Sequence, residues 1–484
     1  MKVLSRFAAL LALTCAGATV LAAGVSARAT GTIGVSFGVA EDASKYAPDG
    51  GKTVYASLKT LGMAENRWTL TFTGDPSVIT DAAFLDKAVP AAVASSTDII
   101  LSLYPASAQI PDPNAFCQWV GNVASRYPAV TKFIIGNEVN ATRFWSPQHT
   151  SSDPNTGPDT YEATLAQCYD VLKAVNPNIQ VIGMGLAPRS VDANSTKPLD
   201  FIRAVGTAYK ASGRTAPIMD EIAVHPYPNP NASPPPAPDQ ATYQDSGFYG
   251  IPQLDRVRQA VYDAFNGTGQ PTTLNGLKLV VDEIGYQSNE TGNPQYTGTE
   301  SSPTVSETQQ ATYYARIVQL YACDPTISAV LFFHLIDEAN LNITSTSGGW
   351  QSGLEYPDGT PKPSFAAVQQ AIAAGCTGAP ATWTPVTTTP PPATTPPPSK
   401  GHGTGSGGGS GFGSGSGFGS GYDGHSHLLC FRIGHHHHHH VVCIPWSFAH
   451  GFGGGDGYGH GNGSGNSHGD GDGNSYGDGS RRDG

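Results

Sequence analysis

Basic residues are scarce in this chain. Its 484 residues include 26 lysines and arginines against 38 aspartates and glutamates, and no stretch gathers the basic residues into a cluster, so the formal charge is −12. An acidic surface of this kind argues against nucleic acid as a partner and against anionic polymers as substrates. Neutral sugars fit this charge better.

Motifs for common cofactors are also missing. Residues 31–376 contain no zinc-ligand spacing, no glycine-rich phosphate-binding loop and no Gly-x-Ser-x-Gly nucleophile elbow. We therefore expect neither a metal nor an organic cofactor. Any chemistry would then come from the side chains themselves.

The apolar run at the start of the chain is short and rich in alanine and threonine, which favours a cleaved signal over a membrane anchor. Two basic residues, Lys2 and Arg6, precede it, and the small-x-small sequence 27–29 follows it. This pattern predicts a secretory signal peptide over residues 1–29. Its removal takes Lys2, Arg6 and Arg28 but no acidic residue, so the charge becomes −15. We expect a secreted protein with no membrane-spanning segment, acting as a monomer.

Composition divides the remaining chain into three parts. Residues 30–378 have a globular composition, residues 379–400 are rich in proline and threonine, and residues 401–484 are rich in glycine, serine and histidine. The second part is typical of a stiff linker, and the third cannot bury a core. One apolar island, 427–448, contains six consecutive histidines; it is either a disulfide-closed hairpin that binds zinc or nickel loosely, or an incidental low-complexity run.

Strand and helix patterns alternate through the globular part. This order predicts a (β/α)8 barrel, whose functional site lies in the loops that follow the strands. Those loops are long (139–160, 228–250, 284–305 and 337–362), whereas the connections after helices are short. The expected strands are 32–40, 66–72, 98–104, 132–140, 180–186, 220–227, 277–287 and 328–336, and the expected helices are 51–64, 83–95, 114–127, 161–175, 198–212, 251–265, 306–323 and 363–374.

Two glutamates stand at the ends of apolar runs. Glu138 follows the run 133–135, and Glu283 ends the run that begins at Leu277. A retaining glycosidase needs two such carboxylates about 5 Å apart, one as proton donor and one as nucleophile. The alternative is that each is a solvated glutamate at a strand end.

The motifs around these glutamates resemble those of clan A glycoside hydrolases, nearest to families 5 and 39. The resemblance covers residues 31–376 and rests on Gly-Asn-Glu (136–138), Asp-Glu-Ile-Gly-Tyr (282–286), His-Pro-Tyr (225–227) and the closing motif 358–364. It implies that Glu138 is the acid/base, Glu283 the nucleophile, and Asn137 a hydrogen-bond partner of the sugar 2-hydroxyl.

The two roles need different surroundings. The acid needs a raised pKa so that it keeps its proton. The nucleophile must stay ionised, which hydrogen-bond donors around it favour. The resemblance implies that Arg67 and Tyr227 supply those donors. His225 lies two residues before Tyr227 and shares its strand face, so both can point into the mouth of the barrel. The alternatives are a structural ion pair for Arg67 and a buried core histidine for His225.

The expected eighth strand departs from the clan pattern. It ends Phe-Phe-His-Leu-Ile-Asp (332–337), without the tryptophan that floors the sugar site in several clan members. Trp350 and Trp145 are the candidates for that platform, and Tyr286 is a further candidate for stacking on a sugar, although loop packing is the alternative. The sequence thus predicts a secreted retaining β-glycosidase acting on neutral poly- or oligosaccharides. The alternative is a non-catalytic carbohydrate-binding barrel, displayed through its tail.

Six of the seven cysteines remain after signal cleavage. An even number in an exported protein favours disulfides. Because neighbouring helices of a barrel are neighbours in space, we expect Cys117–Cys168 and Cys323–Cys376, with Cys430–Cys443 in the tail.

Overall fold

The computed structural model describes residues 34–342 and 349–386, together with the backbone of two short strands, β9 (Leu428–Ile433) and β10 (His440–Pro445). The predicted signal peptide, most of the predicted linker and the remainder of the tail lie outside the described residues.

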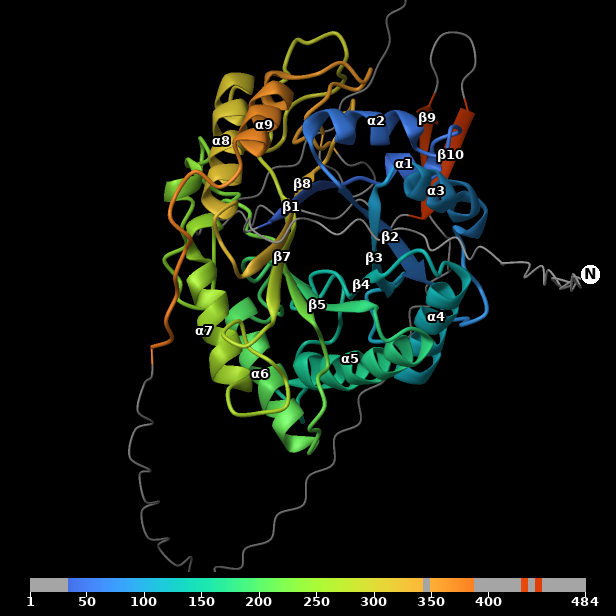
Figure 1. Ribbon diagram of the computed structural model, residues 1–484, viewed down its shortest axis with the longest axis vertical. Helices are drawn as coiled ribbons and strands as arrows, with labels where there is room; N and C mark the ends of the chain where they lie inside the picture. Colours follow the sequence, from blue (N-terminus) through green and yellow to red (C-terminus); the bar gives the residue numbers. More distant parts are fainter. Residues whose placement is uncertain (1–33, 343–348, 387–427, 434–439, 446–484) are drawn as a thin grey trace, which may run out of the picture.

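Eight parallel strands close into a barrel, with neighbours in sequence order and β1 paired to β8 (Figure 1). This confirms the predicted fold. The strands are β1 (Ser36–Ala40), β2 (Glu65–Phe72), β3 (Asp98–Pro105), β4 (Lys132–Ile135), β5 (Gln180–Leu186), β6 (Glu221–Val224), β7 (Lys278–Ile284) and β8 (Ile327–Phe333).

Helices surround the barrel, and one long helix follows each strand (Figure 1). Ser306 and Gln309 form the capping box that starts the helix after β7. The long helices are α2 (Lys52–Leu61), α3 (Ala82–Ala94), α4 (Pro113–Arg126), α5 (Thr156–Val175), α6 (Pro198–Ala211), α7 (Leu254–Phe265), α8 (Glu307–Tyr321) and α9 (Pro363–Ala374); the short ones are α1 (Ala43–Tyr46), η1 (Pro238–Gln240) and η2 (Ile251–Gln253).

The strand expected over 132–140 is shorter than predicted. It ends at Ile135, because Gly136 and Glu138 adopt φ angles of 102° and 42°, which no extended strand contains. The strand expected over 220–227 likewise ends at Val224. In both cases the segment that carries the expected site residues has already left the sheet.

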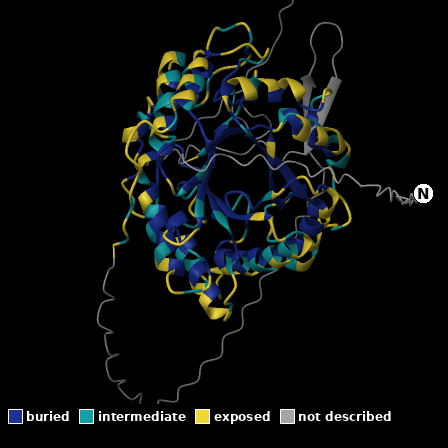
Figure 2. Ribbon diagram, viewed as in Figure 1, coloured by how far each residue is buried: buried dark blue, intermediate teal, exposed yellow. Residues whose placement is uncertain are grey.

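Apolar side chains fill two layers. Inside the barrel the strands alternate so that every second residue points inward, as with Ile100, Ile134 and Ile182, while the opposite faces pack against the helices. Figure 2 shows the strands as the most buried part of the molecule. The packed strands therefore provide a rigid support for a functional site at their ends.

Two disulfides tie neighbouring helices, as predicted. Cys117–Cys168 joins α4 to α5, and Cys323–Cys376 joins the ends of α8 and α9. In the tail, β9 and β10 pair antiparallel with residues 430 and 443 directly opposite. This strand pair favours the hairpin over an incidental run; the third disulfide remains a prediction.

Contacts with the barrel continue past residue 378, the boundary expected for the domain. The backbone N–H of Ala381 donates to Cys323 O at 2.9 Å, and that of Val386 donates to Gln259 Oε1 at 2.8 Å. The Trp383 ring lies 6.4 Å from that of Tyr262. Residues 379–386 therefore belong to the folded domain. Within the described part of the chain, no helix has the length and apolarity needed to cross a membrane.

Candidate active site

Six of the predicted site residues meet at the carboxyl ends of the strands. Arg67 lies in β2 and Glu283 in β7, while Asn137 and Glu138 follow β4, and His225 and Tyr227 follow β6. All six are buried. The barrel thus brings together side chains from four of its strands.

A tight turn after β4 aims Glu138 into this cluster. At Gly136 a Cβ atom would lie 2.3 Å from Cγ1 of Val139, so only glycine fits there. The Glu138 N–H then donates to Gly185 O at 2.5 Å, which anchors the turn to the end of β5. The strained backbone of Glu138 is held by this neighbour.

One nitrogen contacts both glutamates. His225 Nδ1 lies 3.2 Å from Glu138 Oε1 and 3.5 Å from Glu283 Oε2, so these two oxygens are at most 6.7 Å apart, the sum of the two distances. Retaining glycosidases separate their carboxyl groups by about 5–5.5 Å and inverting ones by about 6.5–9.5 Å. This upper limit on one pair of oxygens lies below most of the inverting range and is compatible with the retaining spacing.

Glu283 has donors on both oxygens. Arg67 Nη1 donates to Oε1 at 2.6 Å, and the Tyr227 hydroxyl donates to Oε2 at 3.1 Å. Arg67 also donates to Asn137 Oδ1 at 2.6 Å and lies 3.4 Å from the fully buried Asp282. Burial acts to lower the pKa of Arg67, but the charges of Glu283 and Asp282 outweigh it and raise that pKa. The guanidinium is therefore a fixed positive charge beside Glu283.

His225 is also a cation. Burial acts to lower its pKa, but the charges of Asp282 and Glu283, with the contacts to Asp282 and Glu138, raise it to about 10. Its Nε2 lies 3.2 Å from Asp282 Oδ1. An imidazolium thus links three carboxylates, which a neutral core histidine would not do.

Sequence reasoning missed Arg143, and it predicted the wrong direction for the pKa of Glu138. Arg143, in the loop after β4, forms an ion pair with Glu138 Oε2. Burial acts to raise the pKa of Glu138, but the charge of Arg143 and the hydrogen bond and charge of His225 lower it to about 2, whereas a raised value was expected. The only signal in the sequence was a basic residue five positions after the glutamate; no motif marks it.

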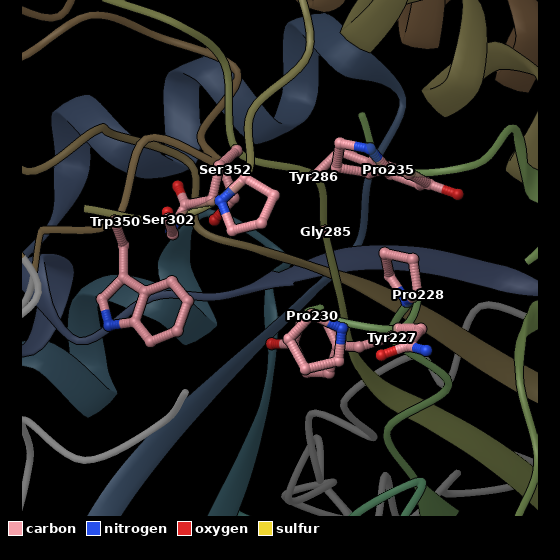
Figure 3. A pocket seen from close by; sticks show the side chains of 12 residues that line it. Tyr227, Pro228, Pro230, Pro235, Gly285, Tyr286, Ser302, Trp350 and Ser352 are labelled. Atoms are coloured by element: carbon pink, nitrogen blue, oxygen red, sulfur yellow. The ribbon is translucent and has the colours of Figure 1, made fainter. Parts of the chain in front are cut away.

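An apolar pocket opens beside Tyr227, which contacts Glu283. Tyr227, Tyr286 and Trp350 line it with four prolines from the loops after β6 and β7, and Figure 3 shows Trp350 across the pocket from Tyr286 and Pro230. The Trp350 ring lies 5.4 Å from that of Phe333 at the end of β8. Trp350 therefore lies beside the end of β8, where this chain lacks the tryptophan of the clan pattern.

The other candidate platform, Trp145, was predicted wrongly. It is fully buried, its ring lies edge-on to Tyr161 at 5.4 Å, and its indole N–H donates to Thr160 at 3.1 Å. It has no exposed face on which a sugar could stack.

Over the described residues, no group of three or more histidines, cysteines or acidic residues is arranged to hold a metal ion.

No family model and no curated protein matches this sequence. Solved structures do match. A family 39 glycoside hydrolase from Bacteroides cellulosilyticus WH2 has 17% identity and a TM-score of 0.47 over 69% of this chain and 62% of that one, so the match spans less than two thirds of that relative.

Two further structures are similar. A GH5_18 enzyme from Streptomyces cattleya, in complex with GlcNAc, has 16% identity and a TM-score of 0.48 over 72% of this chain and 83% of that one. A monomeric beta-xylosidase from Caulobacter crescentus CB15 has 17% identity and a TM-score of 0.45 over 70% and 67%. Families 39 and 5, which the motifs resemble, are thus among the matches. Because the likeness is distant, activity is inferred from the side chains of the site.

Proposed function

We propose that this protein is a secreted, monomeric, retaining β-glycosidase that cleaves neutral poly- or oligosaccharides. The observation that carries the proposal is the pair of glutamates sharing His225 Nδ1, with nearest oxygens no more than 6.7 Å apart. The donors around Glu283 support its assignment as the nucleophile. The two disulfides of the barrel are compatible with an oxidising, extracellular location.

The reaction would proceed in two displacements. Glu283 attacks the anomeric carbon while Glu138 donates its proton to the departing glycosidic oxygen, which leaves a glycosyl ester on Glu283. Glu138, now a carboxylate, takes a proton from water as that water attacks the anomeric carbon and frees Glu283. Arg67 and Tyr227 orient Glu283 in the free enzyme through hydrogen bonds to its two oxygens.

The remaining predicted residues would bind the sugar. Asn137 accepts from Arg67 through Oδ1, so its amide group is the part that would donate to the 2-hydroxyl. Hydrogen bonds to this hydroxyl strengthen in the transition state. Trp350, which lines the pocket beside Tyr227, would stack on a pyranose ring, whereas Tyr286 lines the same pocket but is buried against Tyr313.

A second candidate is a carbohydrate-binding barrel without turnover. The observation in its favour is the ion pair between Arg143 and Glu138, because an ionised Glu138 has no proton to donate. The test is incubation with a panel of neutral β-linked polysaccharides and oligosaccharides. Release of reducing sugar supports the hydrolase; retention on an insoluble polysaccharide without any release would support the binding barrel instead.

A further inference from the structure

Both carboxylate oxygens of Glu138 are occupied. His225 Nδ1 lies 3.2 Å from Oε1, and Arg143 pairs with Oε2. An acid catalyst must present one oxygen, with its proton, to the glycosidic oxygen at hydrogen-bond distance. One of the two contacts must therefore open before the proposed reaction can begin.

His225 is held in place from several sides. Its side chain is fully buried, its Nε2 contacts Asp282, and its backbone N–H donates to Leu186 O at 3.0 Å. Arg143 lies in the long loop after β4, and its side chain is 22% exposed, whereas that of His225 is 0% exposed. Arg143 is therefore the partner that can leave.

The charges around Glu138 also indicate that Arg143 is the partner that leaves. The groups facing Glu138 are Arg143 from its own loop, His225 and Tyr227 after β6, Tyr249 in the loop that follows, and Asp282 and Glu283 in β7 across His225. Among the lowering contributions to the pKa of Glu138, the charge of Arg143 is the largest. Its departure raises that pKa, while the His225 charge stays shared with Asp282 and Glu283.

We propose that Arg143 is a cap on Glu138 that the leaving group of the substrate displaces, and that it then donates to hydroxyl oxygens of a leaving sugar. This inference rests on the proposed function. Breaking the ion pair between the partly buried Arg143 and the buried Glu138 costs free energy unless the guanidinium finds new acceptors. A sugar leaving group supplies them and an aryl group does not. Arg143 is thus a positioning residue that selects glycosides whose leaving group is a second sugar.

The variant Arg143→Gln tests this inference. Arg126→Gln is the matched control, because Arg126 also forms an ion pair, with Asp86, but on the exposed outer surface. The probes are phenyl β-glycosides and β-linked disaccharides of glucose, mannose, xylose and galactose, compared for the sugar that the wild type cleaves fastest. The melting temperature of each variant checks its fold.

In the wild type, the alkaline limb of the pH profile of kcat/KM reports the pKa of Glu138 in the free enzyme. The alkaline limb of kcat reports the same group in the enzyme–substrate complex and should lie at higher pH. Arg143→Gln should move the limb of kcat/KM up by about one pH unit or more, which raises kcat/KM for the phenyl glycoside on that limb about tenfold per unit. The ratio of disaccharide to phenyl glycoside hydrolysis should fall at least about tenfold. Arg126→Gln should change neither.

The variant Arg143→Lys keeps the charge but loses the planar guanidinium. The alkaline limb of kcat/KM should therefore stay near that of the wild type, while the ratio of disaccharide to phenyl glycoside hydrolysis falls. An unchanged alkaline limb of kcat/KM in a folded Arg143→Gln protein would overturn the proposal that Arg143 caps Glu138. A moved limb with an unchanged ratio would overturn the contact with the leaving sugar. If the wild type cleaved no probe, the proposed function would fail and the inference with it, whereas a cleaved probe with an unmoved limb rejects the role of Arg143 alone.

Discussion

Arg67 and Glu283, which lie 216 positions apart in the sequence, meet through a 2.6 Å hydrogen bond at the mouth of the barrel. Arg67 at the same time contacts Asn137 and Asp282, so a single guanidinium connects β2, β7 and the turn after β4. Arg67 therefore helps to fix the position of the proposed nucleophile relative to Asn137 and Asp282.

Replacing Arg67 should impair both stability and activity. Arg67→Met removes a buried cation from Glu283 and Asp282 and leaves them only the contacts with His225 and Tyr227, which should cost about 3–5 kcal/mol of unfolding free energy. Arg67→Lys keeps a charge but cannot contact three side chains at once, so it should fold and lose about 100-fold or more in kcat. Urea unfolding and steady-state kinetics measure the two effects. A lysine variant with wild-type kcat would contradict the role given to the guanidinium.

The two glutamates should respond differently to azide. Glu138→Ala should still form the glycosyl-enzyme from a substrate with a good leaving group and then stall, and azide should release a β-glycosyl azide. Glu283→Ala lacks the nucleophile, so azide can attack only from the opposite face and give the α product. NMR of the products separates the cases. The reverse pattern, or an inverted sugar from the wild type, would show that the roles are misassigned.

Lys362 should be essential for stability although it lies away from the glutamates. Its fully buried ammonium contacts Asp337 Oδ2 at 2.6 Å and Ser288 Oγ at 2.7 Å, which joins the loops after β7 and β8. Lys362→Met should cost about 3–5 kcal/mol because it leaves Asp337 buried and unpaired. The exposed Lys52→Met is the control. Thermal unfolding of the double variant Lys362→Met/Asp337→Asn should show part of the loss recovered.

Glu221, at the start of β6, should make stability depend on pH. Burial, assisted by the charges of Glu65 and Asp220, raises its pKa to about 6 despite Ser328 and Lys132. A carboxyl with a raised folded pKa binds more protons in the folded state, so its contribution to stability is present below about pH 4.5 and is lost as pH rises through about 6. The loss is about 2 kcal/mol. Urea unfolding of Glu221→Gln should lack this pH dependence; an unchanged slope would contradict the assignment.

A chain ending after Val386 should keep the stability and soluble-substrate activity of the full protein. A chain ending after residue 378 loses the contacts of Ala381, Trp383 and Val386 and should melt several degrees lower. Calorimetry of the two truncations distinguishes them. Equal melting temperatures would return the domain boundary to residue 378.

Local pattern was enough to predict much of this molecule. Apolar runs of strand length alternate with helical spacing, and this order depends only on neighbouring residues, so the barrel and most element positions followed from it. Strand ends of a parallel barrel lie on one face whatever their sequence separation. Glu138, Glu283 and their partners Arg67 and Tyr227 could therefore be expected to lie near one another.

Only the tertiary structure decided which charges touch. The pKa of Glu138 depends on Arg143 and His225 within a few ångströms, and no spacing in the sequence reports such a distance. Trp145 and Trp350 both stand in loops after strands, yet one packs against Tyr161 and the other lines the pocket, because burial is set by what the folded loop meets. Periodicity determines which elements form, whereas the contacts between distant segments determine what each side chain can do.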